Sequence, residues 1–477
     1  MNNVASVMQR YLQNSGMNVS YMNYGTKIQE FLDWYRGKTK FHKYQVYNGS
    51  KTIGCERVSL CMAKTVCEDF ASLLLNEKCA MKLSDEISQK YIDECTENNM
   101  FREQANKLIE LTEALGTGAF VEGVDEKGQP VIDYIQGDMI FPLEWDNGKI
   151  TECAFVKIGG DEDNQEYTVI EHRKAEDGTY IIKTTLVDGE GEVVKPLEMV
   201  AEYGNSESDE YRTNSKYPWF QVFTTNIVNN YDKTSPLGMS CFGNAIDILK
   251  SIDVIYDSWH NEFVLGKKRI FVKSDLKSVK IAVGDEITNQ VDENDVVFYQ
   301  IEWTENEKPP IYESNMALRV GEHIEAMDKQ LNLLSRKVGL GDNFYSFTGG
   351  SLGRTATEII SANSALFRNI KKQELPLTRA LKGMVKALLF IGGYNTEQDI
   401  TIDYDDSIIE DTQKIRENAM AEFNAGLIDK IEYFAITKKM TRQQAEQYVK
   451  TMEESNTLKE YGGMIEDMGF GINGVGE

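Results

Sequence analysis

Few residues in this chain have the types and spacing of a catalytic site. Gly37-Lys38-Thr39 matches the end of a phosphate-binding loop, but Leu32 occupies the position of that motif's first glycine. The residues before it are also patterned as a helix rather than a strand. The glycine-rich segment 349–355 precedes a predicted helix and could hold a phosphate through backbone N–H groups, but no lysine completes it. We therefore do not expect nucleotide hydrolysis.

The histidines, cysteines and acidic residues do not form a recognisable metal site either. The histidines are far apart and include no HExxH motif: His42, His172, His260 and His323. Seven cysteines occur without a CxxC pair and are interpreted as buried reduced thiols. One acidic group could bind a cation, although helix capping and solvation usually explain such groups: Asp403, Asp405, Asp406, Glu410 and Asp411. The sequence thus predicts no catalytic residue, no metal and no cofactor, and we do not expect an enzyme.

Composition and charge exclude several classes of protein. With 477 residues, 41% hydrophobic and 27% charged, the chain has the size and composition of a globular protein of two or three domains. Its net charge of −25 disfavours sequence-specific DNA binding, which usually needs a basic stripe. It does not exclude a protein that DNA passes without adhering. The sequence contains no apolar run of about 18 residues, so we predict no membrane span. No secretory signal is recognisable, so a cytosolic location is expected.

The first half of the chain changes from helical to strand patterning. Residues 1 to about 115 are predicted to be mainly helical, with apolar side chains at helical spacing up to Leu74 and a second helix over 104–115. From about 119 to 200 the pattern predicts strands, one of them 131–135. Three dipeptides predict hairpin turns: Asn147-Gly148, Asp177-Gly178 and Asp188-Gly189. The polar segment 204–216 is predicted to be an exposed loop.

Two helical segments then flank a short insert. Residues 243–265 have an apolar side, which includes Phe263, and a polar side, which includes Asp253 and Asp257. Residues 314–338 have a four-three apolar spacing that suits packing along a neighbouring helix. These helices form either an ordinary bundle within one subunit or a part used for assembly.

The insert is strand-patterned. Residues 269–272 and 296–301 are predicted strands, and Pro309-Pro310 is predicted to end the module because neither residue can donate to a ladder. The insert begins with a basic run, Lys267-Lys268-Arg269. This run is either simply solvated or contacts nucleic acid or an acidic partner.

A glycine-rich loop, 339–353, follows the second helix and is predicted to be mobile. A long helix then begins at Thr355, and Pro376 within it predicts a kink. A short strand over 400–404, helices to about residue 451 and a glycine-rich mobile tail complete the chain.

In the order of these parts the chain resembles the portal proteins of tailed double-stranded-DNA bacteriophages, of the type found in siphoviruses and prophages of Gram-positive bacteria. The resemblance covers nearly the whole chain. The segments that carry it are Phe31–Gly37, Met62–Leu75, Phe141–Gly148, the helix–insert–helix unit, Thr355–Ile359 and Asn424–Ile428.

The resemblance implies an α+β portal fold and a ring, usually of twelve subunits, at one vertex of the capsid of the virion. It implies the following division of the chain: a wing over 1–240, stem helices over 241–266 and 314–338, a clip over 267–313, a channel loop over 339–354, a long wing helix over 355–395, and a crown with a flexible tail over 396–477. The ring would assemble in the cytoplasm of the bacterial host.

The resemblance also implies partners and contact residues. The partners are the terminase large subunit, the head–tail adaptor, the major capsid and scaffold proteins, and double-stranded DNA that passes without sequence specificity; no membrane is implied. The residues implied to face DNA in the channel loop are Asn343, Phe344, Tyr345, Ser346, Phe347, Thr348 and Arg354. The residues implied to bind partners in the clip are Lys267, Lys268, Arg269 and Lys273. The alternatives are an intracellular structural ring or scaffold that does not pass DNA, and an enzyme with an unrecognised site.

Overall fold

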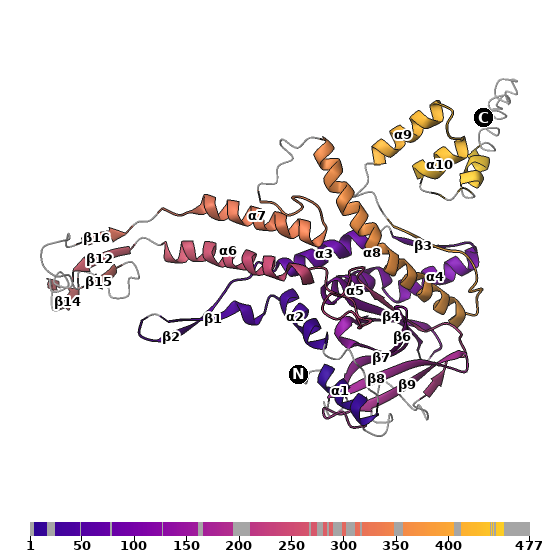
Figure 1. Ribbon diagram of the computed structural model, residues 1–477, viewed down its shortest axis with the longest axis horizontal. Coiled ribbons are helices and arrows are strands. Elements are labelled where there is room, and N and C mark those ends of the chain that lie inside the picture. The colour runs from indigo at the N-terminus through magenta and orange to yellow at the C-terminus, as the bar shows by residue number, and fades with distance from the viewer. Residues whose placement is uncertain are drawn as a thin grey trace, which may run out of the picture. The chain divides into compact units, whose positions relative to one another are not determined.

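Helices dominate the first 115 residues (Figure 1). They are α1 (Val4–Asn14), α2 (Gly25–Tyr35), α3 (Met62–Leu74), α4 (Glu86–Asn98) and α5 (Phe101–Leu115). α3 buries Val66, Phe70 and Leu74 at the predicted helical spacing and packs on α5. α5 ends at Gly116, whose φ of 88° lies in the left-handed region. A Cβ there would lie 2.4 Å from the backbone of Gly238, so this position requires glycine.

The chain divides into two compact units, Met1–Tyr404 and Asp405–Glu477. The computed structural model describes residues 4–16, 24–47, 49–76, 79–125, 127–160, 166–193, 210–266, 269–273, 280–283, 286–289, 298–301, 311–314, 317–347, 356–404, 412–438, 440, 442 and 445–452.

Two antiparallel sheets follow the first helices, and this segregation of helices and strands fits the predicted α+β class. Their strand orders are β10-β9-β8-β7-β6 and β11-β4-β5. The strands are β4 (Thr117–Val124), β5 (Pro130–Gln136), β6 (Ile140–Asp146), β7 (Lys149–Gly160), β8 (Glu166–Glu176), β9 (Thr179–Val187), β10 (Glu210–Arg212) and β11 (Phe220–Thr224). Asn147-Gly148 and Asp177-Gly178 have positive φ at both residues and close the β6–β7 and β8–β9 hairpins, which confirms two predicted turns.

The third predicted turn and the predicted exposed loop differ from the structure. After β9 the chain turns over five residues, with Gly191 rather than Gly189 at positive φ, before Val193 bridges Val187. In the segment predicted to be an exposed loop, β10 pairs with β9, and Thr213 and Ser215 beyond it are buried. Polar composition misled the prediction because these hydroxyls are bonded inside the fold: Thr213 Oγ1 donates to a backbone carbonyl at 2.7 Å.

The N-terminal region is also less helical than predicted. A hairpin of β1 (Lys43–Tyr47) and β2 (Thr52–Glu56) lies between α2 and α3, and it extends away from the rest of the unit (Figure 1). β3 (Ala80–Leu83) pairs antiparallel with β17 (Ile400–Asp403), which confirms the strand predicted near residue 400. The helical prediction failed here because both hairpin strands are only five residues long.

α6 (Ile246–Leu265) and α7 (Val320–Val338) pack on each other and flank the insert (Figure 1). The second helix begins six residues later than predicted, because Ile311–Ser314 forms strand β16. The prediction that Pro309-Pro310 ends the strand module was therefore wrong. A proline that precedes a strand removes no N–H from within that strand's ladder.

Backbone pairing defines two small sheets in the insert. β12 (Arg269–Lys273) is central, parallel to β15 (Phe298–Ile301) and antiparallel to β16. β13 (Lys280–Val283) and β14 (Glu286–Asn289) form a separate antiparallel pair. The two strands predicted from sequence are thus present.

α8 (Ala356–Ile391) continues through Pro376. Proline has no N–H, so the Lys372 carbonyl lacks its usual helical donor. Asn226 Nδ2 donates to that carbonyl at 2.8 Å, and the Asn226 N–H donates to Gln373 Oε1 at 2.6 Å. The chain near β11 thereby satisfies the group that the proline exposes. Thr355, the predicted start of the helix, lies outside the described residues.

The second unit contains α9 (Thr412–Asn424) and α10 (Lys430–Lys438). Aromatic side chains connect them, with the rings of Phe423 and Tyr433 5.4 Å apart. Residues 445–452 are also helical, as predicted for this region.

Candidate functional site

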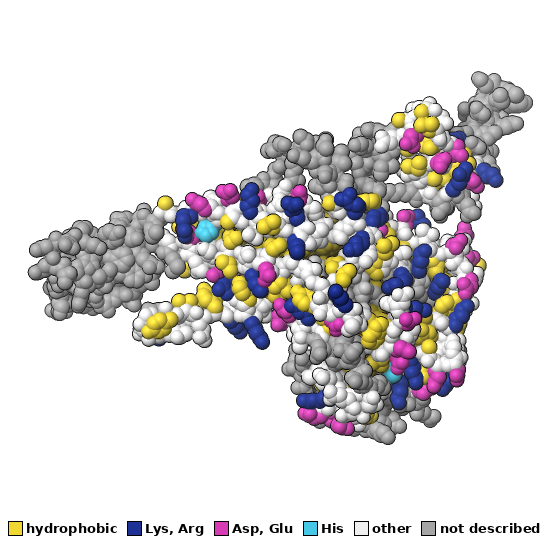
Figure 2. Space-filling view, viewed as in Figure 1, with side chains coloured by type: hydrophobic (Ala, Val, Ile, Leu, Met, Phe, Trp, Pro, Cys, Tyr) yellow, Lys and Arg dark blue, Asp and Glu magenta, His cyan; other side chains and the backbone are white. Residues whose placement is uncertain are grey.

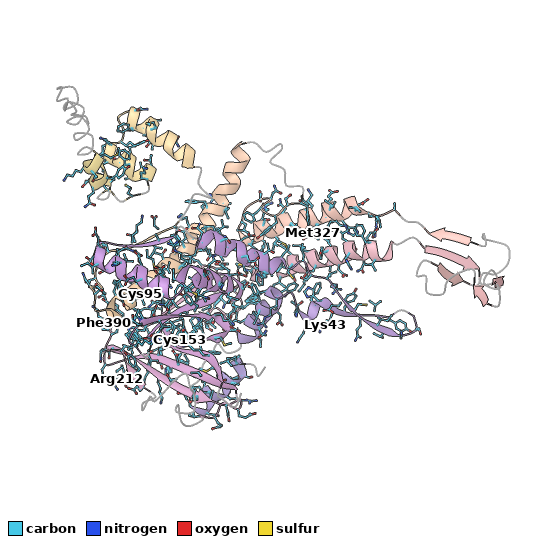
Figure 3. All side chains as sticks on the ribbon, turned by 180° about the vertical axis from the view of Figure 1, so that it is seen from behind. Lys43, Cys95, Cys153, Arg212, Met327 and Phe390 are labelled. Atoms are coloured by element: carbon cyan, nitrogen blue, oxygen red, sulfur yellow. The ribbon has the colours of Figure 1, made fainter. Side chains whose placement is uncertain are left out.

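The α6–α7 pair is joined by an apolar seam and by an ion pair. Met327, Leu331 and Leu334 of α7 are buried, as their spacing predicts, and Figure 3 labels Met327 on this helix. Toward the insert, Glu262 of α6 accepts from Arg319 Nε at 3.1 Å and from Arg319 Nη2 at 2.7 Å. These bonds hold the pKa of Glu262 at about 2, so the carboxylate stays charged near neutral pH.

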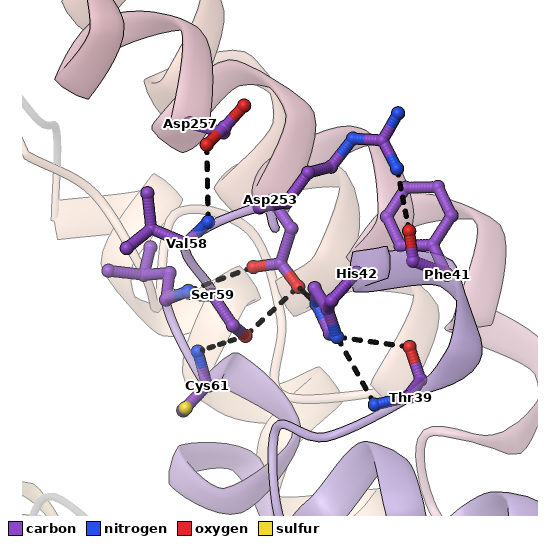
Figure 4. A network of polar contacts seen from close by, with 10 residues as sticks. Thr39, Phe41, His42, Val58, Ser59, Cys61, Asp253 and Asp257 are labelled. Carbon is purple, nitrogen blue, oxygen red and sulfur yellow. Dashed lines mark hydrogen bonds and ion pairs between the residues drawn. The ribbon is translucent and has the colours of Figure 1, made fainter. Parts of the chain in front are cut away.

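One buried carboxylate of α6 holds both ends of the β1–β2 hairpin (Figure 4). On the entering side, Asp253 Oδ2 lies 2.8 Å from His42 Nε2. On the leaving side, Ser59 Oγ donates to Asp253 Oδ2 at 3.0 Å, and the Leu60 N–H donates to Oδ1 at 2.9 Å. The Thr39 N–H donates to His42 Nδ1, so this nitrogen is an acceptor and Nε2 carries the proton that Asp253 accepts. The base of the hairpin is therefore fixed to α6.

The predicted faces of the first helix were partly wrong. Asp253 and Asp257 were placed on its polar side, but both are buried, because backbone N–H groups of the segment after β2 need acceptors there. The Val58 N–H donates to Asp257 Oδ1 at 3.2 Å. Conversely, Phe263 was placed on the apolar side but is 49% exposed. Val254 and Val264 of the same helix are each 44% exposed.

The segment after α7 folds back on the helix pair. The Tyr345 N–H donates to Ser335 Oγ at 2.9 Å. The carboxylate of Asp328 accepts from Ser346 Oγ at 2.7 Å and from the Phe347 N–H at 3.0 Å. Side chains of α7 thus hold the described part of the glycine-rich loop in place.

The aromatic residues of this loop have different surroundings. The Tyr345 hydroxyl donates to Asp69 of α3 at 2.5 Å, and burial raises the pKa of both groups. Phe344 is 40% exposed and Phe347 is 51% exposed. The Phe347 ring also meets the Trp259 ring of α6 edge-on, with centroids 6.2 Å apart.

The structure brings together only some of the predicted contact residues. Asn343 is exposed with a φ of 58°, and it precedes the three aromatic residues and Ser346 in one short segment. Arg269 is the first residue of β12 and Lys273 is the last. The remaining predicted residues lie outside the described part of the chain: Thr348, Arg354, Lys267 and Lys268.

Sequence reasoning missed the residues that position these elements. Asp253 and His42 hold the hairpin base, and Asp328 and Asp69 hold the loop. Asp253 and Asp257 are four residues apart, so they lie on the same face of one helix. This spacing was the one sequence feature that could have indicated a helix face that accepts hydrogen bonds from another segment.

Within the described residues, no group of three or more histidine, cysteine or acidic side chains is arranged to hold a metal ion. Asp403 of the acidic group pairs with Lys82 at 2.7 Å, and the other four members lie outside the described residues. All seven cysteines are free, and Cys67, Cys95, Cys153 and Cys241 are buried. Cys61 is exposed, so the expectation of buried thiols holds only in part.

Gly37-Lys38-Thr39 forms a turn rather than a phosphate-binding loop. Gly37 has a φ of 65° after α2, and Thr39 caps a 3-10 turn over Lys40–His42. Residues 349–355, the other phosphate-binding candidate, lie outside the described residues.

The visible surface is mixed in charge. Figure 2 shows acidic and basic side chains interspersed over α6, α7 and the neighbouring helices, with hydrophobic side chains along the β1–β2 hairpin. None of the helices in the described ranges is both long and apolar enough to cross a bilayer.

Comparison with known proteins identifies the family. No curated protein matches the chain. A family model described as phage portal protein, SPP1 Gp6-like, matches residues 22–458, which include every helix from α2 to α10 and all the strands. The helix–insert–helix unit and the long helix after it lie within this match, and the chain therefore belongs to the SPP1 Gp6-like family of phage portal proteins.

Proposed function

We propose that copies of this chain close into a ring at one capsid vertex and that double-stranded DNA passes through the ring during packaging and ejection. The observation that carries the proposal is the α6–α7 helix pair, which flanks the small β12-centred sheet in the chain. This whole unit lies within the residues that match the portal family. Paired helices with exposed apolar side chains, such as Phe263 and Leu333, suit packing beside further copies.

In this proposal each element has a role. α6 and α7 are stem helices, β12 to β16 form the clip, α8 is the long wing helix, and the second unit belongs to the crown. The clip contacts the terminase large subunit during packaging and the head–tail adaptor afterwards, with Arg269 and Lys273 of β12 among its basic residues. Major capsid and scaffold proteins surround the ring, which most portals build from twelve copies.

The net charge supports passage without adhesion. Each phosphate held by a basic side chain adds affinity and would slow a moving duplex. A chain with 76 acidic and 51 basic residues has a net charge of −25 and repels DNA at long range. Contact is then left to a few placed side chains, and the exposed Phe344 and Phe347 rings of the loop are proposed to lie nearest the DNA path.

Packaging with loop variants tests this proposal. Phe344→Ala and Phe347→Ala are expected to lower the amount of packaged DNA several-fold while ring assembly persists. Ile87→Ala, which removes an exposed apolar side chain from the first turn of α4, is the matched control. If both loop variants package DNA as well as the wild type, the placement of these rings beside DNA is wrong. Rings that bind neither terminase nor adaptor would favour a structural ring that does not pass DNA.

A further inference from the structure

α8 carries a line of basic side chains on its exposed side. Residues 365–391 of this helix include six basic residues and one acidic residue, within a chain of net charge −25. The exposed residues of this range follow one another at intervals of four and three residues: Arg368, Lys372, Leu375, Arg379 and Lys382. Lys386, which is half-buried, continues the series. This spacing follows the helical repeat, so all of these residues lie on one face of α8.

The basic residues of this line are called the basic stripe: Arg368, Lys372, Arg379, Lys382 and Lys386. The stripe is about 27 Å long at the helical rise of 1.5 Å per residue. Beside it, Lys371 pairs with Glu374 at 3.1 Å. Within the described ranges, no side chain forms an ion pair with Arg368, Lys372, Arg379 or Lys382. The exposed part of the stripe therefore keeps its positive charge.

Acidic side chains on the neighbouring elements limit how far this charge reaches. Glu397, after α8, pairs with Lys216 at 3.0 Å, and Asp403 of β17 pairs with Lys82 at 2.7 Å. α4 also packs on α8, and its exposed side is mainly acidic. Exposed charges more than about 10 Å apart are largely screened at about 0.1 M salt. The stripe can therefore attract an anion only at contact distance.

The stripe is held at the surface because the opposite side of α8 is buried. Leu377, Leu381 and Leu388 are each at most 2% exposed, and α8 packs on β4 and β11. In Figure 1 α8 runs in front of β4, and Figure 2 shows basic side chains at the visible surface along its course. Turning the stripe inward would expose these leucines to water, so its direction is fixed.

The stripe begins beside the glycine-rich loop. Asn369, the residue after Arg368, donates from Nδ2 to the carbonyl of Val338, the last residue of α7, at 3.3 Å. Gly339 follows with a φ of 86°, and a Cβ there would lie 2.6 Å from Asn369 Nδ2. The start of the loop and α8 are thus in close contact. From this contact the stripe continues along the surface, next to the loop whose exposed aromatic rings are proposed to lie nearest the DNA path.

The residue types favour nucleic acid over protein as the partner. The core of a protein interface is rich in aromatic residues and poor in lysine. Leu375 is the one apolar residue among the exposed residues of 365–391, and the others are lysine and arginine. Basic side chains aligned along one helix are instead typical of a surface that contacts a phosphate backbone. Double-stranded DNA is the polyanion that the proposed function brings to this chain.

We infer that the basic stripe of α8 contacts the phosphates of double-stranded DNA, without reading its sequence, beside the glycine-rich loop. The inference rests on the proposed passage of DNA and adds a second contact surface to it. A single line of cations meets few phosphates, and the net charge of the chain repels DNA, so the contact is weak and reversible. Such a contact can guide a moving duplex without stopping it.

Binding of DNA to assembled rings tests the inference. The stripe variant Lys372→Gln, Arg379→Gln, Lys382→Gln removes three exposed charges. For a fluorescent duplex of roughly 30 base pairs at about 50 mM salt, we expect its affinity to be at least about tenfold below that of the wild type. The slope of log affinity against log salt concentration should become shallower by roughly two to three units, because fewer counterions are released.

A matched control removes the same charge from exposed lysines of other elements. It is Lys107→Gln, Lys127→Gln, Lys149→Gln, with one change on α5, one in the turn after β4 and one at the first residue of β7. This control should bind DNA like the wild type, with the same salt dependence. Circular dichroism and negative-stain electron microscopy check that both triple variants are folded and form rings.

A photoreactive side chain locates the contact. Leu375 is 66% exposed in the line of the stripe, so Leu375→p-benzoylphenylalanine should become covalently linked to DNA under ultraviolet light. The same replacement of Ile87, which is 69% exposed on α4, should give no linkage to DNA. Linkage of position 375 to another copy of the chain or to a capsid protein, instead of to DNA, would overturn the inference.

Two further results would overturn the inference and leave the ring proposal intact. One is equal affinity and equal salt dependence of the stripe variant and its control. The other is ring formation by the control but not by the folded stripe variant, which would assign the stripe to a contact between copies. A wild-type chain that never forms rings contradicts the proposed function instead, and the inference fails with it.

Discussion

His42 and Asp253 are 211 residues apart in sequence, yet their side chains meet at 2.8 Å in a buried contact. The same carboxylate accepts hydrogen bonds from Ser59 and Leu60. Asp253 is thus the point at which α6 positions the N-terminal hairpin. A conservative substitution of Asp253 should therefore destabilise the hairpin base more than the same substitution at an exposed position of α6.

Asp253→Asn tests this point. The amide group replaces one acceptor oxygen with a donor, which leaves at least one of the buried donors unpaired. We expect the free energy of unfolding to fall by about 2 kcal/mol or more, measured by urea denaturation. Asp247→Asn, at an exposed position in the first turn of the same helix, should change it by less than about 0.5 kcal/mol. Equal effects of the two substitutions would show that the Asp253 contacts are not structural.

The contact between Asn226 and the Lys372 carbonyl predicts an energetic coupling to Pro376. Asn226→Ala should cost about 1 kcal/mol in the presence of Pro376. Pro376→Ala restores an N–H to the helix, so the same Asn226→Ala change should cost less in that background. A double-mutant cycle of unfolding free energies measures the coupling. Additive effects would contradict the role given to Asn226.

How well the sequence predicts the fold depends on where the apolar side chains are buried. Phe70 of α3 and Leu331 of α7 pack within the chain, and their spacing predicts both helices. Val46 and Ile53 belong to short strands whose apolar face meets no core in the described chain, so no long pattern marks them. Ser314 was assigned to a helix because periodicity does not mark the boundary between a short strand and the helix after it.

The site was predicted less well than the fold. The aromatic residues of the loop could be identified from sequence, because glycine-rich composition marks the segment. The carboxylate that accepts from the Tyr345 hydroxyl could not be identified from sequence, because Asp69 is 276 residues from Tyr345 and only the folded chain brings them together. Asp253 looked like a solvated residue for the same reason: its partners belong to a different segment.

Burial raises the pKa of Glu113 to about 8, from an ordinary value of 4.5, and predicts a pH-dependent stability. The folded chain keeps this proton at pH values where the unfolded chain releases it. The stability linked to the group is therefore complete below about pH 4.5 and falls as the pH rises toward 8. Relative to the wild type, Glu113→Gln should therefore gain about 4 kcal/mol of stability between pH 5 and pH 8.5, because each pKa unit corresponds to about 1.4 kcal/mol.

Chemical denaturation at both pH values measures this difference. Glu97→Gln, on the exposed surface of α4, is the control for the removal of a carboxylate that is not buried. A Glu113→Gln variant that gains no stability between pH 5 and pH 8.5 would contradict a neutral buried carboxyl group.

The Tyr345–Asp69 hydrogen bond predicts how the loop is held. Tyr345→Phe leaves the half-buried Asp69 carboxylate without this donor, and we expect a loss of about 1–2 kcal/mol and faster proteolysis within 339–354. Tyr47→Phe removes a hydroxyl that is exposed on the hairpin and donates to a backbone carbonyl, and it should change neither property. Cleavage of the two variants at the same rate would show that this bond does not hold the loop.

The account depends most on closure of many copies around a central opening, and negative-stain electron microscopy of the purified chain tests this most directly. It predicts ring-shaped particles with a central hole, at high protein concentration or after addition of scaffold protein. Single molecules alone, at high concentration and both with and without scaffold protein, would contradict it.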